Sequence, residues 1–164
     1  MSKQVQILSR AYKASDQAAC LAIFRSNIGL YFGAEEIQDY QEFLLNQVED
    51  NHYLVLYLAQ DPAAILACGG FGELEEKIFL RWGMVDQAAH KQGLGLQLLA
   101  HRLAAVNSAL GQREVYIDTS QQVQGFYEKY GFKAISVIKD GFAPQIDKVR
   151  MQFSDWDQAF IQSV

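Results

Sequence analysis

Gly93 and Gly95, two glycines separated by one residue, form the pattern in this sequence that most clearly suggests chemistry. They follow a hydrophobic run and stand at the start of a segment with helical periodicity. The first backbone N–H groups of a helix have no partner within it, and the helix dipole adds positive charge at the same end. Where no Cβ is present, phosphate oxygens can approach these N–H groups closely. Residues 90–96, with Lys91 as an added point charge, are therefore predicted to bind a phosphate-bearing ligand.

The residues after this loop exclude two common phosphate motifs. A P-loop has Lys followed by Ser or Thr after its second glycine, whereas Leu96 and Gln97 follow Gly95 here. A dinucleotide-binding fingerprint needs a third glycine three residues after Gly95, where this chain has Leu98, and no parallel strand–helix–strand repeat follows. The remaining alternative is that the two glycines only permit a tight turn between a strand and a helix.

The composition is typical of one folded domain over residues 1–164, because half of the residues are hydrophobic and a fifth are charged. The net charge is −5 and no basic block occurs, which argues against nucleic acid as the primary partner. An acidic surface gives weak support to a cationic acceptor such as an amine. The sequence lacks a secretory signal and any membrane-spanning run, so we expect a cytoplasmic protein that does not bind membranes.

Two cysteines, Cys20 and Cys68, lie far apart and lack the spacing of metal ligands, so no metal site is predicted. We interpret both as free, reduced thiols of a cytoplasmic protein. Cys68 stands inside an apolar run, where a small buried residue is a commoner explanation than a nucleophile.

Strand and helix patterns alternate along the chain without a linker that would mark a second domain. Apolar runs predict strands at residues 4–9, 52–60, 63–72, 78–85, 115–119, 132–139 and 146–153. Apolar residues at three- and four-residue steps predict four helices, with stripes through residues 21–28, 37–48, 99–110 and 126–130. Ser15 and Asp16 offer N-cap chemistry for the first helix. The expected fold is α/β (α+β), with a mixed, mostly antiparallel sheet of six or seven strands.

The segment from the predicted central strand to Leu110 resembles the acyl-CoA-binding motif of the GNAT N-acetyltransferase superfamily. In that family the loop reads Gln or Arg, two residues, Gly, one residue, then Gly or Ala. Gly93 and Gly95 match this pattern, while His90 stands where Gln or Arg is usual. Residues 125–132, Gly-Phe-Tyr-Glu-Lys-Tyr-Gly-Phe, resemble a second family segment near its C-terminus. Together with the order of elements, the two segments are typical of a GNAT-like sheet with splayed central strands, and short stretches also resemble uncharacterised bacterial members.

The resemblance implies acetyl-CoA as the cosubstrate and a set of residues that contact it. The loop would hold the pyrophosphate, through His90, Lys91, Gln92, Gly93, Leu94, Gly95 and Leu96. The backbone of Met84 and Val85 would bond the pantetheine amides, for which ordinary strand pairing is the alternative. Ser120 stands where the family often has an Asn that bonds the pantetheine arm. Thr119 and Ser120 also have the spacing of a helix cap, with Gln122 three residues after Thr119, and we favour capping for both.

Tyr127 is the one catalytic residue that the resemblance assigns, as the acid that protonates the departing CoA thiolate. A phenol suits this role because phenols and thiols have comparable proton affinities. The alternative is a half-buried aromatic side chain whose hydroxyl merely finds a partner.

A general base is not assigned. The position at which some family members carry a glutamate falls near Phe79, and we interpret Glu73, Glu75 and Glu76 as solvated turn charges. Asp118 ends a buried strand but is not named as the base. Arg81 either orients an acidic acceptor or pairs with a neighbouring carboxylate, and the second is commoner. The loop at residues 27–36, with Tyr31, Phe32, Glu35 and Glu36, faces either the acceptor or the core.

These patterns predict an N-acetyltransferase that transfers an acetyl group from acetyl-CoA to a primary amine of a small molecule or peptide by direct attack. The missing strand glutamate motivates the alternative of a non-catalytic acyl-CoA-binding sensor or regulatory module. The sequence identifies neither the acceptor nor the length of the acyl chain. It also leaves a homodimer open, because it does not decide the oligomeric state.

Overall fold

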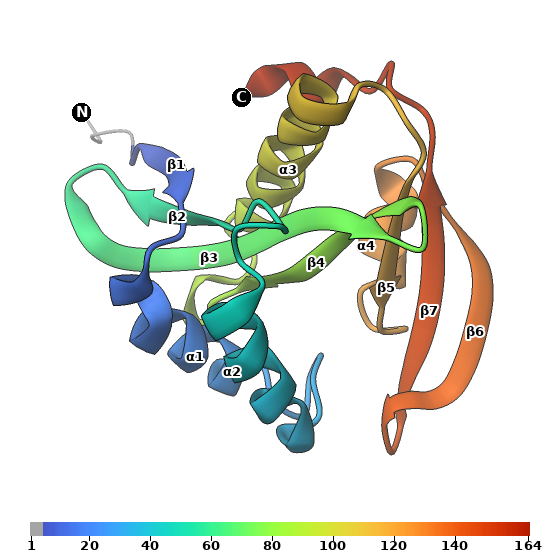
Figure 1. The fold of residues 1–164 in the computed structure, drawn as a ribbon, viewed down its shortest axis with the longest axis horizontal. Helices are drawn as coiled ribbons and strands as arrows, with labels where there is room; N and C mark the ends of the chain where they lie inside the picture. Colours follow the sequence, from blue (N-terminus) through green and yellow to red (C-terminus); the bar gives the residue numbers. More distant parts are fainter. Residues whose placement is uncertain (1–4) are drawn as a thin grey trace.

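The computed structural model describes residues 5–164 as seven strands in one sheet and four α-helices (Figure 1). The strands are β1 (Ile7–Ala11), β2 (Leu54–Leu58), β3 (Asp61–Leu74), β4 (Lys77–Val85), β5 (Val115–Thr119), β6 (Phe132–Ala143) and β7 (Ile146–Phe153). The helices are α1 (Gln17–Ser26), α2 (Ile37–Asn46), α3 (Leu94–Leu110) and α4 (Gln124–Lys129). The predicted fold class is confirmed, and residue 4 of the first predicted strand lies outside the described residues.

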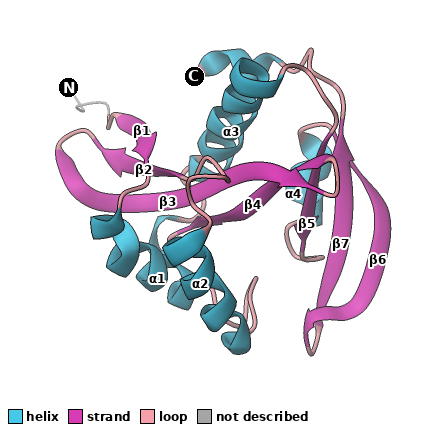
Figure 2. Cartoon of the chain, viewed as in Figure 1, coloured by secondary structure: helices cyan, strands magenta, loops and turns pink. Residues whose placement is uncertain are grey.

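The sheet has the order β1-β2-β3-β4-β5-β7-β6, and β4–β5 is its parallel pair (Figure 2). This pair is short, because β5 aligns with β4 only from Ile78–Val115 to Leu80–Ile117. Beyond that point β4 continues to Val85 and β5 to Thr119 without pairing to each other. The two central strands therefore splay apart, as the sequence resemblance implied.

Helices cover both faces of the sheet, with α1 and α2 on one side and α3 on the other (Figure 1). One core cluster joins Leu99, Leu103 and Val106 of α3 to inward-facing residues of β3, β4, β5 and β7. The other joins α1 and α2 to residues of β2, β3 and β4 that include Val55 and Met84. Apolar side chains that alternate along each strand supply both clusters, because successive strand residues face opposite sides.

A β-bulge interrupts the alternation in β4. Cys68 of β3 pairs with Met84, but Gly70 pairs with Arg81, so Trp82 and Gly83 together oppose the single residue between Cys68 and Gly70. Trp82 has a φ of 47°, a left-handed conformation that a bulky residue rarely adopts. A bulge adds one residue to a strand and re-aims the side chains around it. It lies in the part of β4 that splays from β5.

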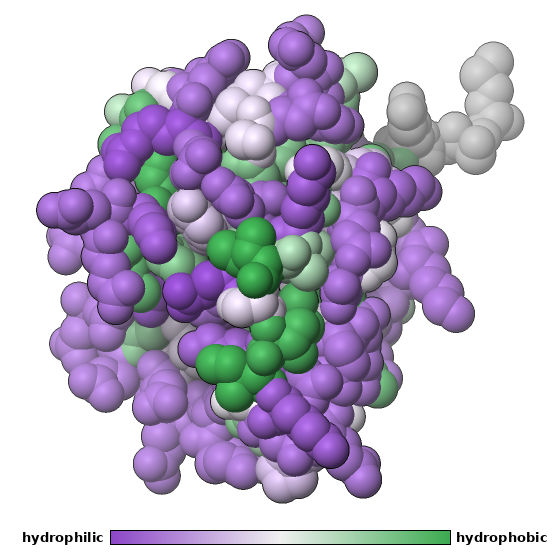
Figure 3. Space-filling model, turned by 90° about the vertical axis from the view of Figure 1, so that its right-hand side faces the viewer, coloured by the Kyte–Doolittle hydropathy of each residue, from purple (hydrophilic) through white to green (hydrophobic). Residues whose placement is uncertain are grey.

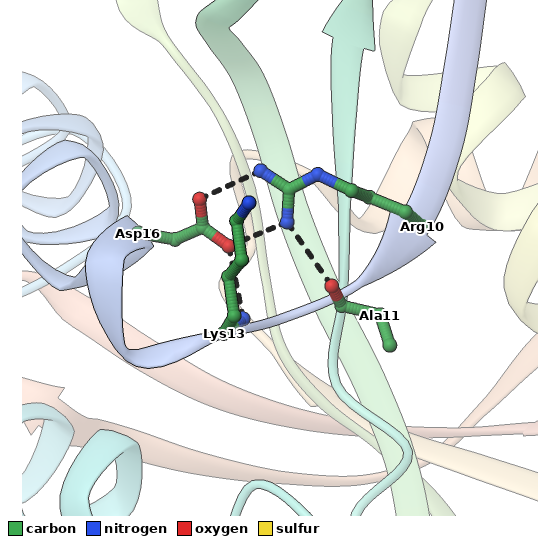
Figure 4. Close-up of polar contacts among 4 residues, drawn as sticks. All are labelled: Arg10, Ala11, Lys13 and Asp16. Carbon is green, nitrogen blue, oxygen red and sulfur yellow. Dashed lines mark hydrogen bonds and ion pairs between the residues drawn. The ribbon is translucent and has the colours of Figure 1, made fainter.

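The start of α1 differs from the predicted cap. Asp16 occupies the N-cap position, but its carboxylate makes no capping bond to the helix. It accepts two hydrogen bonds from Arg10, at 2.7 and 2.8 Å, and one from the Lys13 backbone N–H at 2.9 Å (Figure 4). Burial opposes ionisation, yet these bonds lower the pKa of the Asp16 carboxyl below its usual value. Asp16 thus links the start of α1 to Arg10 of β1 instead of capping the helix.

Other boundaries shift because pairing across the sheet extends the strands. β3 begins at Asp61, within the predicted turn, and β6 continues past residue 139 to Ala143. The predicted cap of α4 is wrong, since its N-cap is Val123 and neither Thr119 nor Ser120 makes a capping bond. A turn over residues 121–123 separates those two residues from the helix.

β6 lies at one edge of the sheet and is exposed over most of its length. Figure 3 shows apolar side chains gathered on the face over this edge, where Ile135, Val137 and Ile138 are each more than half exposed. None of the described helices combines the length and apolar character that crossing a membrane requires.

Candidate active site

A cavity of about 600 Å³ occupies the space between the splayed strands. Its walls are β4 from Leu80 to Val85, the loop before α3 with the first turns of that helix, the end of β5, and α4. Of the predicted cofactor-binding residues, Met84, Val85, His90, Lys91, Gly93, Leu94, Gly95, Leu96, Ser120 and Tyr127 line it. Gln92 is exposed in the same loop but is not among the lining residues. Two segments far apart in the sequence thus meet at one site.

The glycine loop presents the start of a 17-residue helix to the cavity. Gly93 is the N-cap of α3 and has a φ of 77°, a conformation that favours glycine. Gln97 donates the first helical bond, to the Gly93 carbonyl, so the N–H groups of Leu94, Gly95 and Leu96 precede the helical ladder. A Cβ added at Gly95 would meet only the Phe126 ring, at 3.5 Å. The loop can therefore receive an anion at these N–H groups.

His90 folds back from the loop onto the end of β4. Its Nε2 donates to the Val85 carbonyl at 2.9 Å, and the Asn27 amide donates to the same carbonyl at 2.9 Å. A carbonyl oxygen has two lone pairs, so both are used. The substitution of His for the usual Gln or Arg therefore ties the loop to the strand.

Ser120 and Tyr127 lie on the opposite wall of the cavity from β4. The Ser120 hydroxyl is buried and, within residues 5–164, has no hydrogen-bond partner. Tyr127 is 6% exposed, and its ring packs edge-on against Phe126 and Phe132. No protein group in the described part of the chain bonds its hydroxyl. Both oxygens are therefore available to a ligand.

Arg102 is a functional candidate that the sequence analysis missed. Its side chain is 1% exposed, and its Nε and Nη1 have no partner among residues 5–164. The guanidinium lies beneath the bulge, where a Cβ added at Gly83 would stand 2.6 Å from Nη1. It also lines the cavity. Its signal in the sequence was its place three residues after Leu99, inside the apolar stripe of α3.

Arg81 and Asp118 line the cavity toward α2 and β7. Asp118 accepts a hydrogen bond from Arg150 Nε at 2.8 Å and lies 3.7 Å from Lys148 Nζ. Arg81 has no carboxylate within 4.0 Å among the described residues, so the expected pairing is not observed. Instead its guanidinium lies 5.6 Å from the centre of the Phe43 ring. Burial lowers the pKa of Arg81, and Asp118 partly offsets this effect.

The loop between α1 and α2 closes the other side of the site. Phe32 stacks on Phe24 with ring centres 4.9 Å apart, and it also contacts Trp82. A second cavity, of about 290 Å³, lies between this loop and the β6–β7 turn, and it shares Phe32 and Gln122 with the first. Glu36 accepts a bond from the Gly33 N–H at 2.7 Å, which leaves Glu35 as the acidic residue of this second cavity.

No group of three or more His, Cys, Asp or Glu that could hold a metal ion occurs in the described chain. Cys20 and Cys68 are free thiols, as predicted, and both are buried. Cys68 lies 3.3 Å from the Tyr40 hydroxyl, beside the bulge.

Two central strands that splay apart beside a glycine loop at the start of a helix are the arrangement typical of GNAT acetyltransferases. The family model described as "Acetyltransferase (GNAT) domain" matches residues 27–154, so the chain belongs to this family. No curated protein matches the sequence.

Solved structures share the fold at low sequence identity. The PaiA N-acetyltransferase from Thermoplasma acidophilum, in complex with coenzyme A, has a TM-score of 0.69 at 18% identity, and the match covers 91% of this chain and 99% of that one. A chimeric spermidine N-acetyltransferase from Vibrio cholerae has a TM-score of 0.72 at 16% identity, with 91% and 95% covered. The ribosomal-protein-alanine N-acetyltransferase from Brucella melitensis has a TM-score of 0.68 at 20% identity, with 88% and 98% covered.

Proposed function

We propose that this acetyltransferase takes the acetyl group from acetyl-CoA and transfers it to a primary amine of a small molecule or peptide. The observation that carries the proposal is the shape of the larger cavity. It runs from the first N–H groups of α3 to the fork between β4 and β5, and Ser120 and Tyr127 line the β5 and α4 side. An anion-binding end and an end at the strand fork suit a long cosubstrate whose pyrophosphate and thioester are separated by a pantetheine arm.

The polar groups of the cavity fit such a cosubstrate. The N–H groups of Leu94, Gly95 and Leu96 and the ammonium of Lys91 would hold the pyrophosphate. The Ser120 hydroxyl, which has no partner in the described chain, would bond the pantetheine arm. Met84 pairs with Cys68 of β3, and Asn27 and His90 use both lone pairs of the Val85 carbonyl, so the Val85 N–H would be the backbone group left to face the pantetheine amides.

Bound acetyl-CoA would supply an activated acyl carbon, to which the amine nitrogen bonds while the carbon–sulfur bond breaks and sulfur leaves as a thiolate. Tyr127 would give its phenolic proton to that sulfur. Its hydroxyl has no competing partner in the described chain, and its ring is fixed by Phe126 and Phe132. These contacts hold the acid in one position, which favours proton transfer.

Arg102 would supply positive charge to the acyl oxygen as negative charge develops there. A buried guanidinium without an anionic partner costs several kcal/mol of stability, so an anionic or polar ligand oxygen would offset that cost. The guanidinium lies beneath Gly83 of the bulge, and both residues line the cavity. Donors that are already oriented in a dry site stabilise such charge more strongly than water does.

The amine must lose a proton, and among residues 5–164 no unpaired carboxylate lines the larger cavity to take it. Asp118 is the one acidic residue among those that line the larger cavity, and Arg150 and Lys148 neutralise it. The cationic surroundings would lower the pKa of a bound ammonium, because a nearby positive charge disfavours the charged form. Water would then be a sufficient proton acceptor.

The test measures free thiol while the protein is incubated with acetyl-CoA and a broad panel of amines and peptides. Amine-dependent thiol release and a product heavier by one acetyl group are expected. Release that does not depend on any amine, together with tight CoA binding, would favour the second candidate, a non-catalytic acyl-CoA sensor. The neutralised Asp118 is the observation that favours that candidate. We place either activity in the cytoplasm, where the two buried thiols would stay reduced.

A further inference from the structure

Arg81 is a half-buried cation that lines the larger cavity without an acidic partner. Within residues 5–164 it makes no ion pair, whereas Arg10, Arg113 and Arg150 each pair with a carboxylate. Its guanidinium lies over the face of the Phe43 ring, 5.6 Å from the ring centre. A guanidinium so placed presents planar donors that match a carboxylate in two parallel hydrogen bonds.

The bulge decides which side of the sheet Arg81 faces. Arg81 and Trp82 both contact aromatic rings of the α1–α2 layer, whereas the next residue, Gly83, faces Arg102 of α3. Two consecutive side chains therefore face the same side, which ordinary alternation would forbid. That side lies across the sheet from α3, and Arg81 lines the larger cavity there.

The neighbouring charges on this side are mostly positive. Asp118 of β5 is held by Arg150 and Lys148 of β7, and Arg150 also stacks 4.9 Å from the centre of the Phe79 ring. Arg150 and Lys148 thus compensate the Asp118 carboxylate, and Arg81 does not pair with it. Glu75, in the β3–β4 turn, acts on Arg150 from a distance. On the α1–α2 side of the sheet, the cavity-lining charge that stays unpaired within residues 5–164 is that of Arg81, whereas Arg102 lies on the α3 side and Lys91 in the glycine loop.

From these observations we propose that the acceptor amine carries a carboxylate, that Arg81 binds this carboxylate, and that the acceptor is a free amino acid. The proposal rests on the acetyltransferase function proposed above and adds the substrate class. With the carboxylate on Arg81, the amine of an amino acid, two bonds from the carboxyl carbon, would lie in the same cavity that reaches the fork between β4 and β5. The side chain would enter the second cavity, which adjoins the first through Phe32 and Gln122.

The same charges select against other amines. A polyamine would bring several positive charges to a cationic wall, and each like charge costs binding free energy. An N-terminal peptide amine lacks the adjacent carboxylate, because that group forms the next peptide bond. Both classes would therefore be poor acceptors.

The experiment compares matched acceptors, the L-amino acids and their carboxamides, in a thiol-release assay with saturating acetyl-CoA. The wild type should prefer the acid over its amide by roughly tenfold or more in kcat/KM, with the difference mainly in KM. Arg81→Gln should remove the preference by raising KM for the acid alone, while Arg81→Lys keeps part of it. Arg113→Gln is the matched control, since Arg113 forms an exposed pair with Glu73 outside the lining of either cavity.

Equal use of acid and amide by the wild type would overturn the proposal and leave the acetyltransferase function standing. So would a preference that survives in Arg81→Gln with an unchanged melting temperature and unchanged CoA affinity. Turnover of spermidine or of N-terminal peptides above that of every amino acid would also overturn it. Absence of turnover with all acceptors is a different result, which contradicts the acetyltransferase function and this proposal together.

Discussion

The Tyr53 hydroxyl donates a 2.8 Å hydrogen bond to the backbone carbonyl of Trp82, the residue at the bulge of β4. Since its one proton is used there, the 2.8 Å contact with Tyr40 has Tyr40 as the donor. Burial raises the pKa of both phenols well above the usual value, so both stay neutral. A chain of hydrogen bonds from the α2 side thus holds the strained backbone that lines the cavity.

Tyr53→Phe should lower the free energy of unfolding by about 1–3 kcal/mol, because the buried Trp82 carbonyl and the Tyr40 hydroxyl both lose a partner. Urea denaturation measures this change. Tyr57→Phe is the control, since Tyr57 lies on the same region of the sheet and no bond to its hydroxyl is present in the described residues. An equal effect of both substitutions would show that the loss comes from the ring environment and not from the bulge.

Gly95→Leu should abolish CoA binding while the protein stays folded, because its Cβ meets only the Phe126 ring and the rest of the side chain would fill the space above the helix N–H groups. Gly125→Leu, at an α4 glycine with open space around it, is the matched control. His90→Ala should weaken binding only modestly, since His90 bonds the Val85 carbonyl. Calorimetric titration with CoA measures all three. Equal losses of affinity for Gly95→Leu and His90→Ala would show that the helix N–H groups alone do not hold the pyrophosphate.

Tyr127→Phe should reduce kcat by about 100-fold or more, the usual contribution of a general acid, and leave CoA affinity within about twofold. The single-turnover rate and the CoA dissociation constant, each measured for Tyr127→Phe and for the wild type, check this prediction. Tyr130→Phe serves as the control, because Tyr130 also lines the cavity and lies at the end of the same helix. An unchanged rate for Tyr127→Phe would contradict the acid role.

Arg102→Met should lower kcat by about 100-fold, as expected when a preorganised donor to a developing oxyanion is removed. The melting temperature should stay the same or rise, because the substitution removes a buried, unpaired charge. Arg102→Lys should recover part of the rate. If Arg102→Met lowers the melting temperature and leaves kcat unchanged, the guanidinium supports the bulge and does not act on substrate.

Asp16→Asn should lower the free energy of unfolding by about 1–3 kcal/mol near neutral pH, since charge-assisted bonds from Arg10 are lost. The pKa of Asp16 is lower in the folded state than in the unfolded chain. Its contribution is therefore complete above the unfolded value of about 3.9 and disappears as pH falls through the folded value. Denaturation of Asp16→Asn and wild type across about pH 2–7, which extends about two units below and three units above the unfolded value, should show their difference shrinking in acid. Asp39→Asn, on the exposed face of α2, should show no such trend.

Much of the fold could be predicted from the sequence. Residues 115–119 and 146–153 form strands with the predicted bounds, and the helix after the glycine loop ends before Gly111 as expected. These features are local, because apolar periodicity and glycine conformations act within a few residues. The loop at Gly93 and the segment around Tyr127 can also be recognised from the sequence, because each is a pattern of neighbouring residues.

The rest depends on contacts between distant residues. Asp16 was predicted to cap α1 but bonds Arg10, and Ser120 was predicted to cap α4 but lines the cavity. Only the pairing of β3 with β4 creates the bulge that turns Arg81 toward α2 and leaves Arg102 beneath Gly83. The sequence by itself determined the family pattern and the phosphate loop, because both are written in neighbouring residues. The tertiary structure decided which charges stay unpaired at the site, because burial and ion pairing depend on residues that the chain brings together only when it folds.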